Sequence, residues 1–258
     1  MAVVALAAAG CGSSRFGLPR PASSQAGHIL ALWRVLFLTA VAIGGLVIAL
    51  ILWSVVRYRR PPDGGPPVQT RGNVPLEAFY TAVPLAIVVA LFALTVRTQH
   101  QVTRLSVRPD LRVDVTGFQW GWRFHYPDAG VTVTGDANRN PVLVLPEGRT
   151  VELALSTADV IHSFFVPSFL EKRDMVPGVD NRIDVETTRL GRFPGLCAEF
   201  CGLDHARMGF TVEVVSPQDF QAWLSTAASQ QTDQPGAPGA SAPGEGGSAG
   251  RQASVAVG

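Results

Sequence analysis

Cysteine is scarce in this chain of 258 residues, which contains three of them, Cys11, Cys197 and Cys201. Because Cys11 stands in the extreme N-terminal segment, no framework of several disulfides is available to the fold. The pattern Cys-x-x-Cys-His is absent, so the sequence has no attachment motif for a c-type haem. Hydrophobic residues make up 47% of the chain. That content allows one globular domain of ordinary size together with membrane segments.

Charged residues are also few, at 16%, and their signs are segregated although the net charge is only +1. Residues 105–225 contain 16 Asp and Glu against 11 Lys and Arg, whereas the rest of the chain contains 4 against 10. The acidic C-terminal part favours a basic partner, although ordinary solubility charge would give the same count. A nucleic-acid partner is not predicted.

Two apolar runs, 29–56 and 76–96, are each long enough to span a bilayer, which requires about 20 apolar residues. They predict a transmembrane hairpin over residues 28–104, with Arg34 reaching back to the membrane surface and His28 and His100 flanking the spans. The loop between them is basic, which predicts a cytoplasmic loop and two chain ends on the outer face. Three arginines after the second span count against this orientation, namely Arg97, Arg104 and Arg108.

The two ends of the chain are predicted to lie outside the folded domains. Residues 1–27 comprise a small apolar segment ending in Leu-Ala-Ala-Ala-Gly-Cys11 and a polar linker. The segment is typical of a bacterial lipoprotein signal, which would make Cys11 a lipidation site, or of a plain leader. Residues 229–258 are rich in Gln, Pro, Gly, Ser and Ala, which predicts a disordered tail.

Short segments of alternating hydrophobicity begin near residue 111 and are separated by Gly, Pro and Asp turns, which predicts an all-β sandwich over residues 105–228. A short helix is expected after Ser216, which would cap it, with Pro217 in its first turn. The predicted strands cover residues 111–117, 131–134, 142–145, 150–155, 182–188 and 209–215.

Donors for a soft metal gather in one stretch, Cys197-Ala-Glu-Phe-Cys201-Gly-Leu-Asp-His205-Ala-Arg-Met208, with His162 upstream. Thiolate and thioether sulfurs favour copper, and these five side chains exceed the needs of one tetrahedral ion. In a two-copper interpretation, the two cysteines bridge both ions and one histidine caps each. Met208 and the backbone carbonyl of Glu199 are then weak axial ligands.

Three simpler interpretations compete with the two-copper site. A disulfide between Cys197 and Cys201 would leave both histidines and Met208 unexplained. A structural zinc site would not need the methionine, and a mononuclear blue copper site needs only one cysteine.

The loop pattern C-x-E-x-C-x-x-x-H-x-x-M after an upstream H-S-x-x-x-P resembles the dinuclear copper A centre in subunit II of the haem-copper cytochrome c oxidases. The resemblance implies a cupredoxin-like Greek-key sandwich on the outer face of the bacterial inner membrane. It also implies that electrons pass from cytochrome c to the haem-bearing subunit I, where oxygen is reduced with proton translocation, and that a subunit III is present. His162 is expected at the end of one strand and the Cys197 loop between two later strands.

The resemblance assigns roles to two further residues. The segment around Glu77 is similar to P-x-E-x-x-[WFY]-T-x-x-P, in which the Glu stands at the cytoplasmic mouth of a proton pathway; otherwise Glu77 is a helix-capping charge. In the aromatic run 117–126, Trp120 matches the position where electrons arrive from cytochrome c. Gly121 replaces an aromatic residue of the family and is expected to loosen this patch, and His125 is expected at the surface.

The carboxylate of Glu199 is further predicted to hold Mg or Mn shared with subunit I, because hard cations prefer oxygen ligands. Two other functions remain open from the residues alone. A quinol oxidase subunit II has the same fold but lacks the copper ligands. A copper-binding electron-transfer module unconnected with oxygen reduction needs only one membrane anchor and no intramembrane carboxylate.

Overall fold

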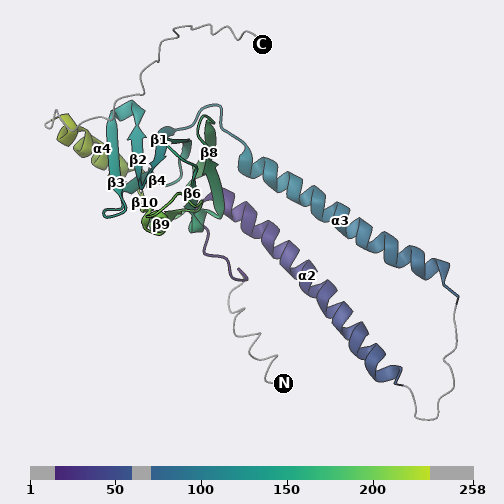
Figure 1. Cartoon of the computed structure of the whole chain (residues 1–258). Coiled ribbons are helices and arrows are strands. Elements are labelled where there is room, and N and C mark those ends of the chain that lie inside the picture. Colours follow the sequence, from purple (N-terminus) through teal and green to yellow (C-terminus); the bar gives the residue numbers. More distant parts are fainter. Residues whose placement is uncertain (1–14, 60–70, 233–258) are drawn as a thin grey trace, which may run out of the picture.

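The structure is a computed structural model and describes residues 15–59 and 71–232 (Figure 1). Cys11, Arg60 and the part of the predicted tail after Thr232 lie outside the described residues. Two long helices extend from one side of a β-sandwich, and both point away from it in broadly the same direction (Figure 1). The chain thus has the predicted two parts, a helical hairpin and an all-β domain.

The helices are α2 (Ser24–Arg57) and α3 (Val74–Thr103), and both are long and apolar enough to cross a membrane. Their 34 and 30 residues correspond to lengths of about 51 and 45 Å, more than the roughly 30 Å of a hydrocarbon core. Asn73 caps α3 by accepting a hydrogen bond from the amide of Leu76. The helices therefore extend beyond the predicted spans, and one end of each reaches the sandwich.

The start of α2 corrects the predicted linker, because the helix begins at Ser24, within residues 1–27. The hydroxyl of Ser23 accepts a hydrogen bond from the amide of Ala26 over 3.1 Å and so caps the helix. Ala22 is fully buried, and its amide donates to the carbonyl of Ser168 over 2.9 Å. This segment is fixed to the sandwich and does not act as a free connection.

The sandwich consists of two five-stranded sheets with the orders β3-β2-β1-β5-β8 and β4-β10-β9-β6-β7. The pairs β1–β5 and β4–β10 are parallel, and the other pairs are antiparallel. The strands are β1 (Leu111–Phe118), β2 (Gly121–Tyr126), β3 (Val131–Asp136), β4 (Val142–Pro146), β5 (Thr150–Thr157), β6 (His162–Val166), β7 (Glu171–Met175), β8 (Asn181–Glu186), β9 (Gly191–Cys197) and β10 (Gly209–Val215).

The core between the sheets is centred on aromatic rings close to the cysteine end of β9. Trp122 of β2 meets Phe210 of β10 edge to face at 4.9 Å, and Phe164 of β6 stacks on Phe210 at the same centroid distance. Such pairs add about 0.5–1.5 kcal/mol each beyond the burial of their area. They give the donor-bearing strands a rigid support.

Strand β2 runs through the aromatic segment, and its alternation buries Trp122, Phe124 and Tyr126. Gly121, predicted to loosen this segment, has the opposite effect. A Cβ atom there would lie 2.2 Å from the carbonyl oxygen of Gly135. The glycine therefore permits the close approach of β2 to β3.

Helix α4 (Pro217–Thr232) closes the described chain and begins as predicted, because the hydroxyl of Ser216 accepts a hydrogen bond from the amide of Asp219. It continues past the predicted start of the tail at Ser229. The side-chain amide of Gln231 donates to the carbonyl of Thr132 over 2.7 Å and accepts from its amide over 3.0 Å. These two bonds fix the last turn of α4 against β3.

Candidate metal centre

Three neighbouring elements bring the donor side chains to one end of the second sheet. His162 begins β6, Cys197 ends β9, and Met208 immediately precedes β10. The amide of Cys197 donates to the carbonyl of Met208 over 3.0 Å, so the loop 198–208 returns to the point where it started. The sequence prediction for the placement of His162 and of this loop agrees with the structure.

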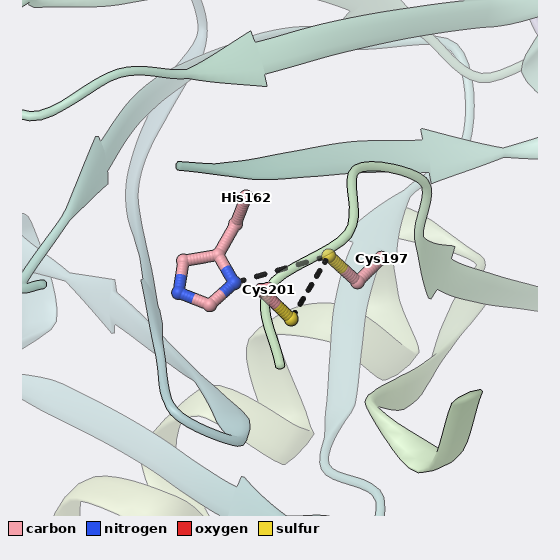
Figure 2. Close-up of side chains that lie close together, drawn as sticks. All are labelled: His162, Cys197 and Cys201. Atoms are coloured by element: carbon pink, nitrogen blue, oxygen red, sulfur yellow. Dashed lines mark hydrogen bonds between the residues drawn. The ribbon is translucent and has the colours of Figure 1, made fainter. Parts of the chain in front are cut away.

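The donor atoms form one compact cluster, the donor row, whose members contact one another in succession. Sγ of Cys197 lies 3.8 Å from Nδ1 of His162 and 3.9 Å from Sγ of Cys201 (Figure 2). Sγ of Cys201 lies 3.6 Å from Nδ1 of His205 and 3.7 Å from Sδ of Met208. His162, Cys197, Cys201 and Met208 are at most 4% exposed, and His205 is half-buried. His162 therefore contacts Cys197, and His205 contacts Cys201.

Asp159 holds the far side of the His162 ring, a role that the sequence prediction missed. Its Oδ1 lies 2.8 Å from Nε2 of His162, while its carboxylate also accepts the amides of Gln119 and Val160, each over 2.7 Å. A Cβ on Gly117 would approach the same ring to 3.2 Å. The ring is thus oriented with Nδ1 toward the cysteines. An aspartate three residues before a ligand histidine is the signal that could have indicated this contact.

The two thiols differ in acidity. Burial opposes ionisation of Cys197, but its contacts with His162 and with the backbone of Glu199 lower its pKa to about 6. Burial and the adjacent charge of Cys197 raise the pKa of Cys201 to about 12. Burial disfavours the imidazolium of His162, yet the contacts with Cys197 and Asp159 leave its pKa raised. Without metal, the pair therefore holds one thiolate and one thiol at neutral pH.

Glu199 presents two different groups. Its backbone carbonyl oxygen lies 3.2 Å from Sγ of Cys197, so the carbonyl faces the donor row. Its carboxylate points to Lys172, whose Nζ is 3.3 Å away, and the side chain is 45% exposed. The predicted carboxylate site for a hard cation therefore already has an ion-pair partner in this chain.

Trp120 lies in the β1–β2 turn at the edge of the donor row and is half-buried. Its Nε1 donates to the carbonyl of Cys201 over 3.1 Å, and Nε2 of Gln119 donates to the same oxygen over 2.8 Å. Gly202 adopts φ +116°, and a Cβ there would meet the Trp120 ring at 3.2 Å. The indole is thus in direct contact with the cysteine loop.

The donor set fits copper by its chemistry. Two thiols, two imidazoles and a thioether are the ligands that copper prefers. Metal bonds to sulfur and nitrogen of about 2.0–2.3 Å allow donors up to roughly 4.5 Å apart to share an ion. Ligand atoms of His162, Cys197 and Cys201 all lie within 4.8 Å of one another. His205 and Met208 also contact Cys201, which leaves donors for more than one position.

The sandwich matches a known family from its first strand to its last. The profile described as "Cytochrome C oxidase subunit II, periplasmic domain" covers residues 111–215. The probable cytochrome c oxidase subunit 2 of Streptomyces avermitilis is 40% identical over 253 residues, which cover 83% of this chain and 79% of that protein. The chain belongs to the cytochrome c oxidase subunit II family.

A further relative and one solved structure are also similar to this chain. The cytochrome c oxidase subunit 2 of Mycobacterium tuberculosis is 32% identical over 286 residues, covering 87% of this chain and 79% of that protein. A crystal structure shows the periplasmic domain of subunit II of cytochrome oxidase of Bradyrhizobium japonicum. Its sequence is 32% identical to this chain, and the match covers 49% of this chain and 99% of that one, with a TM-score of 0.45.

Membership in the cytochrome c oxidase subunit II family makes this chain a subunit of an oxidase that works with other oxidase subunits. It confirms the predicted function at this level and the predicted fold of two long apolar helices and a cupredoxin-like sandwich. The quinol oxidase subunit and the module unconnected with oxygen reduction are thereby set aside.

Glu77 lies in the first turn of α3, at the end remote from the sandwich (Figure 1). Its Oε1 accepts a hydrogen bond from the amide of Asn73 over 3.2 Å, and the side chain is exposed. The capping contact that the sequence offered as one interpretation is therefore present. It leaves the carboxylate accessible from the surroundings of the helix.

Proposed function

We propose that the donor row holds two copper ions that receive electrons from a cytochrome c and pass them to the haem-bearing subunit I, where oxygen is reduced. Cys197 and Cys201 would bridge the ions and His162 and His205 would cap one each. Met208 and the carbonyl of Glu199 would be weak axial ligands. The succession His162, Cys197, Cys201, His205, with neighbouring donor atoms 3.6–3.9 Å apart, carries this proposal.

A copper pair bridged by thiolates supplies a one-electron relay whose charge is shared by both ions. The protein contributes a dry and rigid surrounding. Four donors are buried and Asp159 fixes the His162 ring, so the ligands are held in place by the fold, as outer contacts hold ligands in other metal sites. The two-copper arrangement would use all of these donors and would leave no open ligand position for a substrate.

Trp120 is the proposed point where electrons arrive, because its indole is half-buried beside the cysteine loop and bonded to the carbonyl of Cys201. A basic cytochrome c would be steered by the acidic excess of residues 105–225. The side chains of Phe200 and Leu203 are 78% and 89% exposed on the same loop and offer apolar contact to a docked partner.

The hairpin is proposed to cross the bacterial inner membrane, with the sandwich on the outer face and subunits I and III beside it. The sandwich and Glu77 lie at opposite ends of α3 (Figure 1). This placement would put Glu77 on the cytoplasmic side, where it would stand at the mouth of a proton pathway into subunit I. Lipidation of Cys11 remains a prediction.

The carboxylate of Glu199 is also proposed to contribute to a Mg or Mn site shared with subunit I. Its exposure makes it accessible to a neighbouring subunit, and the carbonyl of the same residue faces the copper ligands. Such an ion would have to displace Lys172, which lies 3.3 Å from the carboxylate.

Metal analysis and electron paramagnetic resonance of the full chain in detergent test the copper proposal. Two coppers per chain and a mixed-valence signal with one electron shared equally by both ions are expected. One copper per chain with a localised signal would contradict the dinuclear site, and retention of zinc in preference to copper would contradict the metal.

A further inference from the structure

A pocket separate from the metal centre lies between α2 and α3, near the ends of the helices that face the sandwich. Its volume is about 810 Å³, within the range of roughly 300–1,000 Å³ that is common for small-molecule sites. Part of its wall is apolar and comes from Phe92, Ala93 and Val96. This wall belongs to the apolar span of α3 and suits an alkyl chain.

The remaining wall is basic. Arg97 and His100 follow Ala93 at spacings of four and three residues, which places all three along one face of α3, and Arg104 follows directly after the helix ends at Thr103. His28 of α2 completes this wall. Within residues 15–59 and 71–232, no carboxylate pairs with Arg97 or Arg104. Two guanidinium groups and two imidazoles thus line the pocket without a counter-ion from the described chain.

The order of these residues along α3 matches the layers of a membrane. The apolar span ends at residue 96 and the first charged side chain is Arg97. Basic groups immediately outside the hydrocarbon layer lie at the depth of lipid phosphates. Arginines on the outer side oppose the usual excess of positive charge in cytoplasmic loops. A bound anion would give them a role.

We propose that this pocket binds one anionic phospholipid of the outer leaflet. Arg97 and Arg104 would hold the phosphate as charged donors, and His28 and His100 would add hydrogen bonds. An acyl chain would lie against Phe92, Ala93 and Val96. This site goes beyond electron transfer and depends only on the proposed membrane placement.

The test uses the full chain in nanodiscs of phosphatidylcholine with a minor fraction of phosphatidylglycerol. Native mass spectrometry measures how far phosphatidylglycerol is enriched on the protein. The double variant Arg97→Gln/Arg104→Gln should lower this enrichment by roughly tenfold or more, because each basic group near the surface contributes substantially to anionic lipid binding. Arg108→Gln, which removes the same charge four residues beyond the pocket, should leave it unchanged.

A second variant, Ala93→Phe, keeps the charges and fills the apolar part, and it should also reduce the enrichment. Copper content is measured on each variant and reports the folded metal centre independently of lipid binding. Failure of the lipid proposal can therefore be distinguished from failure of the copper proposal. Equal enrichment in the double variant and the wild type would overturn the lipid site. Binding of inorganic phosphate without any preference for anionic lipid would also overturn it. So would a purified oxidase in which the double variant loses subunit I but retains its lipid.

Discussion

The carboxylate of Asp159 and the imidazole of His162 meet at 2.8 Å on the side of the ring that faces away from the cysteines. The two ring nitrogens therefore have separate tasks, since Nδ1 lies 3.8 Å from Sγ of Cys197 and Nε2 is held by the carboxylate. Amides of Gln119 and Val160 hold the carboxylate in turn. The orientation of a buried ligand thus depends on a residue outside the donor motif.

Asp159→Asn should weaken copper binding about 10- to 100-fold, the usual cost of removing a group that orients a metal-ligating histidine. Competition of the full chain with a chelator of known affinity measures this loss. Asp204→Asn is the matched control, because it removes a carboxylate of the cysteine loop that pairs with Arg207 and not with His162. Equal affinity of the Asp159 variant and the wild type would show that the contact does not position the ligand.

With Cys11 replaced by Ser, the metal-free chain should show two widely separated thiol titrations, one near pH 6 from Cys197 and one near pH 12 from Cys201. Thiolate absorbance followed against pH measures both. Below pH 6 both sulfurs are protonated and copper must displace both protons, so copper affinity should fall as pH falls. Cys197→Ser should remove the lower step. Two thiols that titrate together near their ordinary pKa would refute the asymmetry.

Met208→Leu should keep copper bound but shift its reduction potential, because a thioether is a weak axial ligand that tunes the metal. Met208 is only 1% exposed, and the exchange of Met for Leu in a core costs less than about 1.5 kcal/mol. Met175→Leu is the control for the exchange itself, since Met175 is equally buried but belongs to β7, where it lies opposite His162 across the strand pair and is not a member of the donor row. A potential identical in all three proteins would remove Met208 from the ligand set.

Glu199→Gln should loosen Mg or Mn in the assembled oxidase while copper stays bound, because the backbone carbonyl near Cys197 is preserved. Lys172→Gln should have the opposite effect, since it frees the Glu199 carboxylate from an ion pair at 3.3 Å. Metal analysis of the purified oxidase compares both variants. A hard-cation content that neither variant changes would mean that this carboxylate does not contribute to such a site.

The donor set and the helical hairpin could be predicted from sequence because each depends on local spacing. Strand β9 could not, since Gly-Arg-Phe-Pro-Gly-Leu-Cys contains residues that disfavour strands. The tertiary structure accommodates them. Pro194 lies beyond the two β9 residues that pair with β6, and a side chain on Gly195 would collide with the ring of Phe210 at 2.3 Å.

The contacts around the donors were equally invisible to local patterns. Asp159 belongs to no donor motif, yet the fold places it against His162. Gln119 and Trp120 share the carbonyl of Cys201, a contact between residues more than 80 positions apart. Such pairings depend on how the two sheets are stacked, which alternation along a single strand does not specify.

Replacement of Trp120 tests where electrons arrive. Trp120→Phe should slow electron transfer from reduced cytochrome c severely, while binding and its dependence on salt stay nearly unchanged. The loop should survive the change, because Gln119 still donates to the carbonyl of Cys201 over 2.8 Å. Gln119→Ala is the matched control, since it removes the other hydrogen bond to that oxygen and keeps the indole.

Neutralising acidic groups should do the reverse. Asp174→Asn and Asp204→Asn should weaken binding of a basic cytochrome c but leave transfer within the docked complex unchanged. Salt screens such a field over about 8–10 Å at physiological ionic strength, so the association rate should fall as salt rises. Stopped-flow mixing of the assembled oxidase with reduced cytochrome c over a series of ionic strengths separates the two effects. An association rate that does not depend on salt would reject electrostatic steering. Normal electron transfer in Trp120→Phe together with slow transfer in Gln119→Ala would place the electron route through the loop carbonyl and not through the indole.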